Sequence, residues 1–119
     1  MKIVYGNKKV ERHCSDLKAA LKLFGGNKEL AISLLARVNA IKNAKVIKDI
    51  IVIQLFRFHR LRGDLKRYFA IDVKSVRDKW RIILEPLDEN EERFDPCNID
   101  EIATFVYVVR IKEVSPHYE

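Results

Sequence analysis

Residues 68 to 85 read YFAIDVKSVRDKWRIILE and have the pattern of a β-hairpin. Side chains alternate in character over residues 68–73, which predicts a strand with one buried face. The polar run at residues 74–79 predicts a turn, and the apolar run at residues 79–85 predicts the second strand of the pair. We therefore expect an antiparallel hairpin here and place the other elements relative to it.

Two helices are expected upstream of this hairpin. Ser15 offers an N-cap oxygen for the first helix, which ends at Gly25-Gly26, where glycine tolerates a left-handed backbone. The second helix begins at Asn27, and its apolar side chains fall on one stripe: Leu30, Leu34, Leu35, Val38 and Ile41. Together they predict an α-hairpin. Three other upstream segments are expected. Residues 2–5 predict an edge strand, residues 8–14 predict one or two helical turns, and residues 43–56 predict a connector with some helix.

Downstream of the hairpin, residues 86–100 predict an acidic loop, and residues 104–114 predict a central strand because their first half is apolar on both faces. The order is a strand, two helices and then three strands. It predicts an α+β fold, a single domain over residues 1–119, in which helices cover one face of a mainly antiparallel sheet. The other face is expected to be free for function.

Charge is distributed unevenly over the 119 residues, whose formal net charge is +6. Residues 85–101 hold eight acids and one base, so the rest of the chain holds 22 bases and 9 acids. Residues 42–81 alone hold twelve bases against four acids. A basic body of this kind attracts polyanions, since neutralised phosphates release counterions. The alternative interpretation is a soluble, basic surface that binds nothing.

Several function classes find no support in the sequence. It contains no Walker loop, GxGxxG, HExxH, GxSxG or paired-carboxylate motif, and we expect no metal and no cofactor. Cys14 and Cys97 form no CxxC motif and are interpreted as free thiols. No apolar run reaches the roughly 20 residues that span a bilayer, and none has the form of a signal peptide. We therefore expect a cytoplasmic protein that does not contact a membrane.

Four short motifs follow one another in a familiar order. They are Leu61-Arg62-Gly63-Asp64 before an alternating strand, Trp80-Arg81-Ile82-Ile83-Leu84-Glu85, Val109-Arg110-Ile111-Lys112-Glu113-Val114, and a tail that contains His117 and Tyr118. In this order they resemble the RelE/ParE superfamily of toxins from bacterial type II toxin–antitoxin pairs, and HigB-like members are the most similar. The resemblance covers residues 55–119 by motif and the helical hairpin by order alone.

This resemblance implies a RelE-like, microbial ribonuclease-like fold. It also implies a ribosome-dependent endoribonuclease that cuts mRNA in the A site without a metal and so inhibits translation. The implied partners are a cognate antitoxin, mRNA and ribosomal RNA, and the toxin alone is expected to be a monomer. Two other functions stay open: a ParE-like inhibitor of DNA gyrase without nuclease chemistry, and a non-toxic basic regulatory domain.

The chain contains the side chains that metal-free RNA cleavage needs. Such cleavage requires a base for the 2′-hydroxyl proton, cations at the phosphate and an acid for the leaving 5′-oxygen. Arg81 is the expected phosphate contact, because a guanidinium suits phosphate oxygens, and His117 and Tyr118 are the expected groups for proton transfer or base stacking. His59 is interpreted as a structural histidine. The expected contacts to the RNA backbone are Arg60, Arg62, Lys66 and Arg67.

Overall fold

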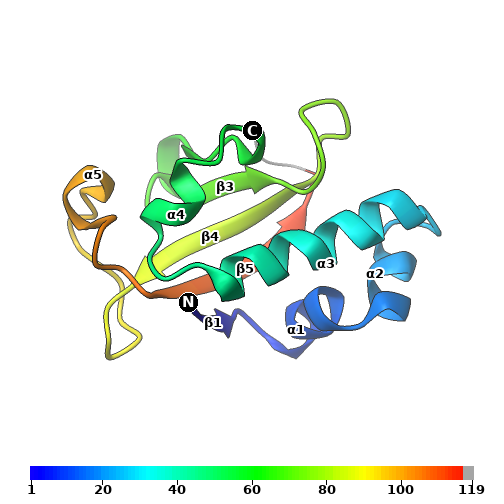
Figure 1. Cartoon of the computed structure of the whole chain (residues 1–119), viewed down its shortest axis with the longest axis horizontal. Helices are drawn as coiled ribbons and strands as arrows, with labels where there is room; N and C mark the ends of the chain where they lie inside the picture. The colour runs from blue at the N-terminus through cyan, green and yellow to red at the C-terminus, as the bar shows by residue number, and fades with distance from the viewer. Residues whose placement is uncertain (117–119) are drawn as a thin grey trace.

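The computed structural model describes residues 1–116, which form an α+β fold around one five-stranded mixed sheet (Figure 1). The strands are β1 (Lys2–Tyr5), β2 (His59–Arg60), β3 (Phe69–Asp72), β4 (Arg81–Leu87) and β5 (Val108–Ser115). The α-helices are α1 (Lys8–Ser15), α2 (Leu17–Leu23), α3 (Lys28–Asn43), α4 (Lys48–Ile51) and α5 (Ile99–Ile102). Two 3-10 turns flank β2, namely η1 (Gln54–Phe56) and η2 (Gly63–Leu65).

The sheet has the strand order β1-β5-β4-β3-β2 and is mainly antiparallel, as expected. The hairpin predicted at residues 68–85 is the β3–β4 pair, in which Phe69 lies opposite Leu84 and Asp72 opposite Arg81. The exception to the antiparallel pattern is β1, which runs parallel to β5. This pairing joins the two ends of the described chain, and local sequence pattern gives no signal for it.

Capping side chains explain where the helices begin. Asn27 starts α3 as predicted, with its Oδ1 accepting a hydrogen bond from the backbone N–H of Leu30 at 3.1 Å. The prediction that Ser15 is an N-cap is wrong, because Ser15 ends α1 and donates its hydroxyl to the carbonyl of Glu11. Asp16 caps α2 instead. The helical turns expected at residues 8–14 are α1, so three helices follow one another before the hairpin.

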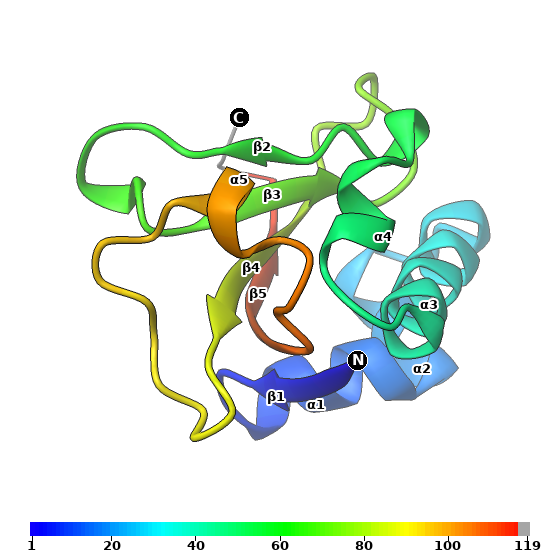
Figure 2. The same ribbon diagram turned by 60° about the vertical axis from the view of Figure 1, so that its left-hand side comes forward.

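The main core lies between the α-helices and one face of the sheet. Its fully buried residues include Leu34 and Ile41 from α3, Ile47 before α4, and Ile82 and Ile111 from the two central strands. Figure 1 looks onto this side, with α3 and α4 in front of the strands, and Figure 2 shows α3 and α4 to the right of the sheet. Each α-helix from α1 to α5 contributes residues to this core or packs against it.

The opposite face of the sheet is covered by the loop at residues 61–68, between β2 and β3, rather than by an α-helix. A small apolar cluster there joins Leu61, Tyr68, Ala70 and Ile83, and Leu65 packs against it. No α-helix among residues 1–116 contributes to this cluster. We call this side the loop face of the sheet. Ala70 and Ile83 are nevertheless fully buried, so the loop face is not the bare surface that the sequence suggested.

The strand predicted at residues 104–114 begins four residues later, at Val108. The preceding residues form a turn after α5, where Phe105 and Tyr107 are about half exposed. The carbonyl of Val106 accepts a hydrogen bond from the N–H of Ile47 at 2.8 Å, and the carbonyl of Tyr107 accepts one from the N–H of Lys2 in β1 at 2.9 Å. The apolar run therefore includes a turn, held by the connector before α4 and by β1, ahead of the strand itself.

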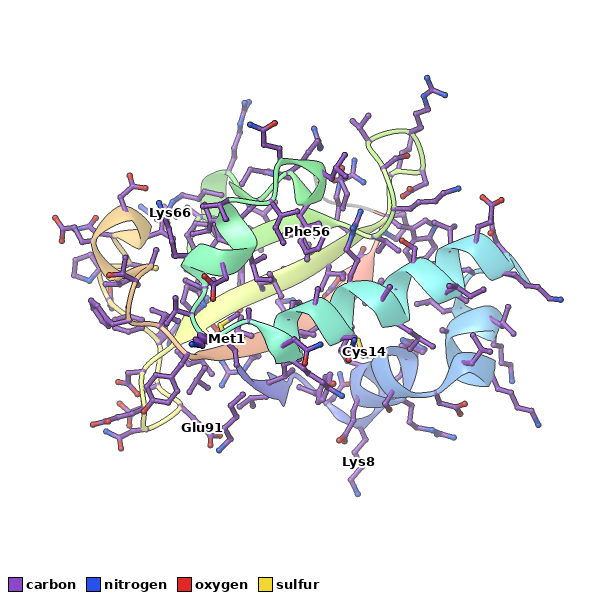
Figure 3. The ribbon with its side chains drawn as sticks, viewed as in Figure 1. Met1, Lys8, Cys14, Phe56, Lys66 and Glu91 are labelled. Atoms are coloured by element: carbon purple, nitrogen blue, oxygen red, sulfur yellow. The ribbon has the colours of Figure 1, made fainter. Side chains whose placement is uncertain are left out.

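The thiols and one glycine show how closely the first helix packs. Cys14 and Cys97 are free, as predicted, and Cys14 is 2% exposed on the inner side of α1, whereas Lys8 extends away from the molecule (Figure 3). Burial raises the pKa of the Cys14 thiol to about 12.

Gly6 leads into α1, and a Cβ atom there would lie 2.7 Å from the carbonyl oxygen of Lys112. This turn therefore requires glycine.

Candidate nucleic-acid interface

Arg81 opens β4 and is buried against Asp72, which closes β3. The Nε of Arg81 lies 3.2 Å from Oδ1 of Asp72, without hydrogen-bond geometry, and its Nη1 donates to the carbonyl of Trp80 at 2.8 Å. Only 4% of the Arg81 side chain and 1% of the Asp72 side chain are exposed. From the sequence we expected Arg81 to contact a phosphate. In the structure its guanidinium is instead buried and paired with the carboxylate of Asp72.

Arg57 shares the same carboxylate and reaches the surface. Its Nε donates to Oδ2 of Asp72 at 2.8 Å, while 44% of its side chain is exposed. The residue has a left-handed backbone (φ 51°) at the end of η1, which turns the chain toward β2. One buried carboxylate thus holds two arginines, and the local charge of the three groups is +1. Arg57 presents that charge to solvent.

His59 lies beside Arg57 with its ring oriented by the backbone. The Nδ1 atom of His59 is 2.6 Å from the carbonyl oxygen of Arg57. Because a carbonyl only accepts, Nδ1 carries the proton in this contact, and the neutral ring then has its lone pair on Nε2. His59 pairs with Ala70 in the β2–β3 register, and paired residues share a face, so its side chain belongs to the loop face.

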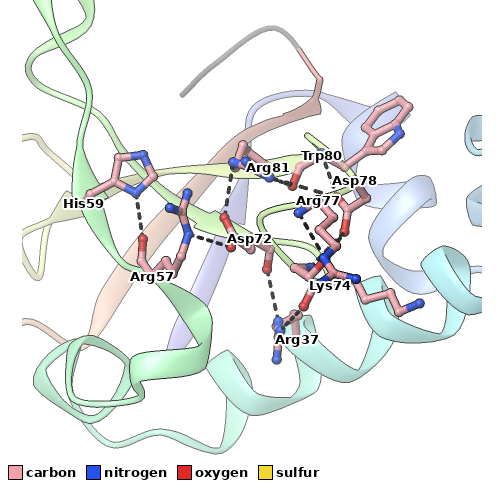
Figure 4. Close-up of polar contacts among 10 residues, drawn as sticks. Arg37, Arg57, His59, Asp72, Lys74, Arg77, Asp78, Trp80 and Arg81 are labelled. Carbon is pink, nitrogen blue, oxygen red and sulfur yellow. Dashed lines mark hydrogen bonds and ion pairs between the residues drawn. The ribbon is translucent and has the colours of Figure 1, made fainter.

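Figure 4 shows the arrangement of these side chains around Asp72. We call Arg57, His59, Asp72 and Arg81 the arginine–histidine cluster. Arg37 of α3 contacts the same segment from the helical side: it donates hydrogen bonds to the backbone carbonyls of Asp72 and Lys74, each at 3.0 Å. Partial burial lowers the pKa of Arg37, and the negative charge of Asp72 opposes that shift.

The four expected RNA-binding residues are not brought together as one surface. Arg60 faces away from His59, because neighbouring strand residues point to opposite sides of a sheet. Its guanidinium lies over the ring of Phe69 and donates to the carbonyls of Lys66 and Cys97, so it fastens the loop. Arg62 and Lys66 are exposed in that loop. Arg60 therefore has a structural role, whereas Arg62 and Lys66 are accessible to solvent.

Arg67 belongs to a second polar group on the loop face. It donates to the hydroxyl of Tyr68 at 2.7 Å, and this hydrogen bond is the main reason that the pKa of Arg67 is raised. Its Nε lies 3.7 Å from Oε2 of the buried Glu85, which also pairs with Arg110 at 2.8 Å. Residues of the acidic loop, including Glu91 and Glu92, line a hollow of about 520 Å³ beside this group.

His117 and Tyr118 lie outside the described residues. Ser115, the last residue of β5, is opposite Arg81 in the β4–β5 register, so the described chain leaves the sheet beside the arginine–histidine cluster. Both side chains therefore stay sequence predictions.

Sequence reasoning missed Arg57 as a site residue and interpreted His59 as structural. The period of a strand separates His59 from Arg60, which are neighbours in β2. It does not reach Arg57, whose left-handed backbone lies before the strand, so no spacing in the sequence pairs Arg57 with His59. The shared carboxylate of Asp72 could not be identified from the sequence, because it is 15 residues from Arg57.

No protein-family model and no curated protein sequence matches the chain. Within residues 1–116, no three His, Cys, Asp or Glu side chains are placed to hold a metal ion. In the same range, no helix has the length and apolar character needed to span a membrane. What the fold and site define is an α+β domain with a cationic cluster at one end of its sheet.

Proposed function

We propose that this protein is a HigB-like toxin of the RelE/ParE superfamily, a ribosome-dependent mRNA endoribonuclease that a cognate antitoxin neutralises. The observation that carries the proposal is that Arg57 and Arg81 share the buried carboxylate of Asp72, while His59 contacts the backbone carbonyl of Arg57. These residues come from the stretch in which the sequence resembles that superfamily. The helices on one face of a mainly antiparallel sheet also agree with the fold that the resemblance implies.

The cluster contains groups suited to the first step of RNA cleavage. In that step the 2′-oxygen loses its proton and attacks phosphorus, and the bond to the 5′-oxygen breaks, which leaves a 2′,3′-cyclic phosphate and a 5′-hydroxyl. The Nε2 lone pair of His59 can accept the 2′-hydroxyl proton. Arg57, half exposed and held by Asp72, can donate to the charged phosphate oxygens.

The buried half of the cluster has a positioning role in this proposal. Arg81 and Asp72 hold each other through opposite charge, and Asp72 in turn orients Arg57. A guanidinium that is already oriented loses less entropy when it binds a phosphate. The proton for the leaving 5′-oxygen is assigned to His117 or Tyr118, on the sequence resemblance alone. A small antitoxin would neutralise the toxin by covering the cationic surface with complementary charge.

The experiment that tests this function is a brief induction of the intact protein, followed by sequencing of RNA 5′ ends. We expect growth arrest and new mRNA ends at fixed codon positions, in the wild type but not in Arg57→Ala. Intact transcripts together with gyrase–DNA adducts would instead support a gyrase inhibitor. Unimpaired growth with folded wild-type protein in the absence of antitoxin would contradict a toxin of either kind.

A further inference from the structure

A second cationic site lies on the helical side of the molecule, between α1 and α2. The two helices enclose an open groove of about 860 Å³. Its lining includes Lys9, Arg12 and His13 from α1, Lys18 and Lys22 from α2, and Asp16 between the helices. We call it the α1–α2 groove. It is separate from the arginine–histidine cluster, because α1 packs over β1 and β5 whereas that cluster lies at β2, β3 and β4.

The charge of the groove is strongly positive and is not neutralised by the chain itself. Lys9, Arg12, Lys18 and Lys22 are exposed, and within residues 1–116 none of them forms an ion pair with a carboxylate. The one acid in the lining, Asp16, accepts a hydrogen bond from the N–H of Lys18 at 3.1 Å as the cap of α2. The lining therefore has a net charge of +3 with His13 neutral.

His13 reports the positive potential in the groove. Its pKa is lowered, first by partial burial and then by the charges of Lys9 and Arg12. A bound anion would offset these two charges. The apolar residues of the lining are Ala19 and Leu23, which are both half-buried.

The shape and lining of the groove select among polyanions. A lipid surface is a poor ligand, because the lining has only two apolar residues, Ala19 and Leu23, and both are half-buried, so little apolar area is available to enter a membrane. Among residues 1–116, no Phe, Tyr or Trp lines the groove, and one half-buried imidazole, His13, is a poor platform for a run of unpaired bases. Lysines on both walls suit phosphates of a backbone that is held without regard to sequence.

We propose that the α1–α2 groove binds the phosphate backbone of folded RNA. The choice of ribosomal RNA as that ligand rests on the proposed function, because a ribosome-dependent enzyme meets folded RNA beside its mRNA substrate. The groove and the arginine–histidine cluster lie on different sides of the sheet. The enzyme would therefore hold ribosomal RNA on its helical side while mRNA reaches the loop face.

The test compares two double variants of the full chain that lose the same charge. Lys18→Gln/Lys22→Gln changes the groove, and Lys45→Gln/Lys48→Gln changes two exposed lysines in and before α4. Binding to a 2′-O-methylated RNA duplex, which cannot be cleaved, is measured over a range of salt concentrations, with circular dichroism as the folding control. Single-stranded RNA of the same length and phosphatidylserine vesicles are the other two probes.

For the groove variant we expect about tenfold weaker duplex binding and a salt slope, in log Kd against log salt, that is lower by about two, because each substituted lysine neutralises about one phosphate in the wild type. The matched variant should bind within about twofold of the wild type. Equal losses in both variants would show a net-charge effect and overturn the proposal. So would a loss confined to vesicles or to single strands. Because no cleavage is measured, a failure of the nuclease assignment leaves this result interpretable.

Discussion

Asp72 and Arg81 face each other at the ends of β3 and β4, with Oδ1 and Nε 3.2 Å apart and both side chains almost completely buried. The same carboxylate receives Arg57 at 2.8 Å from the surface side. A buried charge is stable only when it is paired, so each member of this group limits what can replace the others.

Asp72→Asn should destabilise the protein without changing its shape. The amide is nearly the same size as the carboxylate, but it leaves the buried guanidinium of Arg81 with only the more distant carboxylate of Asp78, whose Oδ1 lies 4.0 Å from Nη1. The expected loss in the free energy of unfolding is about 3 kcal/mol or more, measured by urea denaturation. Asp64→Asn, at an exposed position, should change it by less than about 0.5 kcal/mol. Equal small effects in the two variants would contradict a structural role for the buried pair.

Arg57→Ala should separate activity from stability. About half of the Arg57 side chain is exposed, and its removal leaves Asp72 paired with Arg81. We expect ribosome-dependent mRNA cleavage to fall by about 10² or more, with a stability loss below about 2 kcal/mol. Arg81→Ala should lose both activity and much of the folded stability. Cleavage rates paired with urea unfolding distinguish the two, and an Arg57→Ala variant that cleaves normally would remove this residue from the site.

His59→Gln should slow cleavage by about 10² to 10⁴ if His59 takes the 2′-hydroxyl proton. Glutamine can still donate to the carbonyl of Arg57 but has no group that accepts a proton near neutral pH. The control is Lys45→Gln, because Lys45 is exposed and lies outside both the cluster and the α1–α2 groove. Single-turnover cleavage on programmed ribosomes is the measurement. Equal rates for His59→Gln and wild type would return His59 to a structural role.

Cys14 should make folded stability depend on alkaline pH. Its pKa is raised by burial from 9.0 to about 12, so the folded state keeps the thiol proton more tightly than the unfolded chain does. The resulting stability is fully present below about pH 9 and is lost as the pH rises toward 12. Urea midpoints measured from pH 8 to pH 11 should fall less steeply in Cys14→Ala than in the wild type. An identical slope in the two proteins would contradict the shift.

Thiol labelling gives a second readout of the same burial. At pH 8.5, iodoacetamide should modify the half-buried Cys97 before Cys14, and both should react in urea.

Local sequence pattern predicted the elements whose signals are local. Asn27 caps α3 and Gly25-Gly26 ends α2, because side-chain capping and a left-handed backbone depend on the residues present at those positions. The alternation after Tyr68 predicted β3 for the same reason. The strand predicted from residue 104 was placed four residues too early, because an apolar run does not show which of its residues are buried: in residues 104–107 only Val106 is, and the segment forms a turn after α5.

The sequence by itself determined the residue types, the cap of α3, the central hairpin and the basic character of residues 42–81. Only the tertiary structure decided that Arg81 is buried, that Arg60 fastens a loop and that Arg57 and His59 share a site. The period of a strand sets which residues lie on the same face. Whether that face meets water depends on segments that pack on it from far along the chain, and long-range contacts of that kind have no local signature.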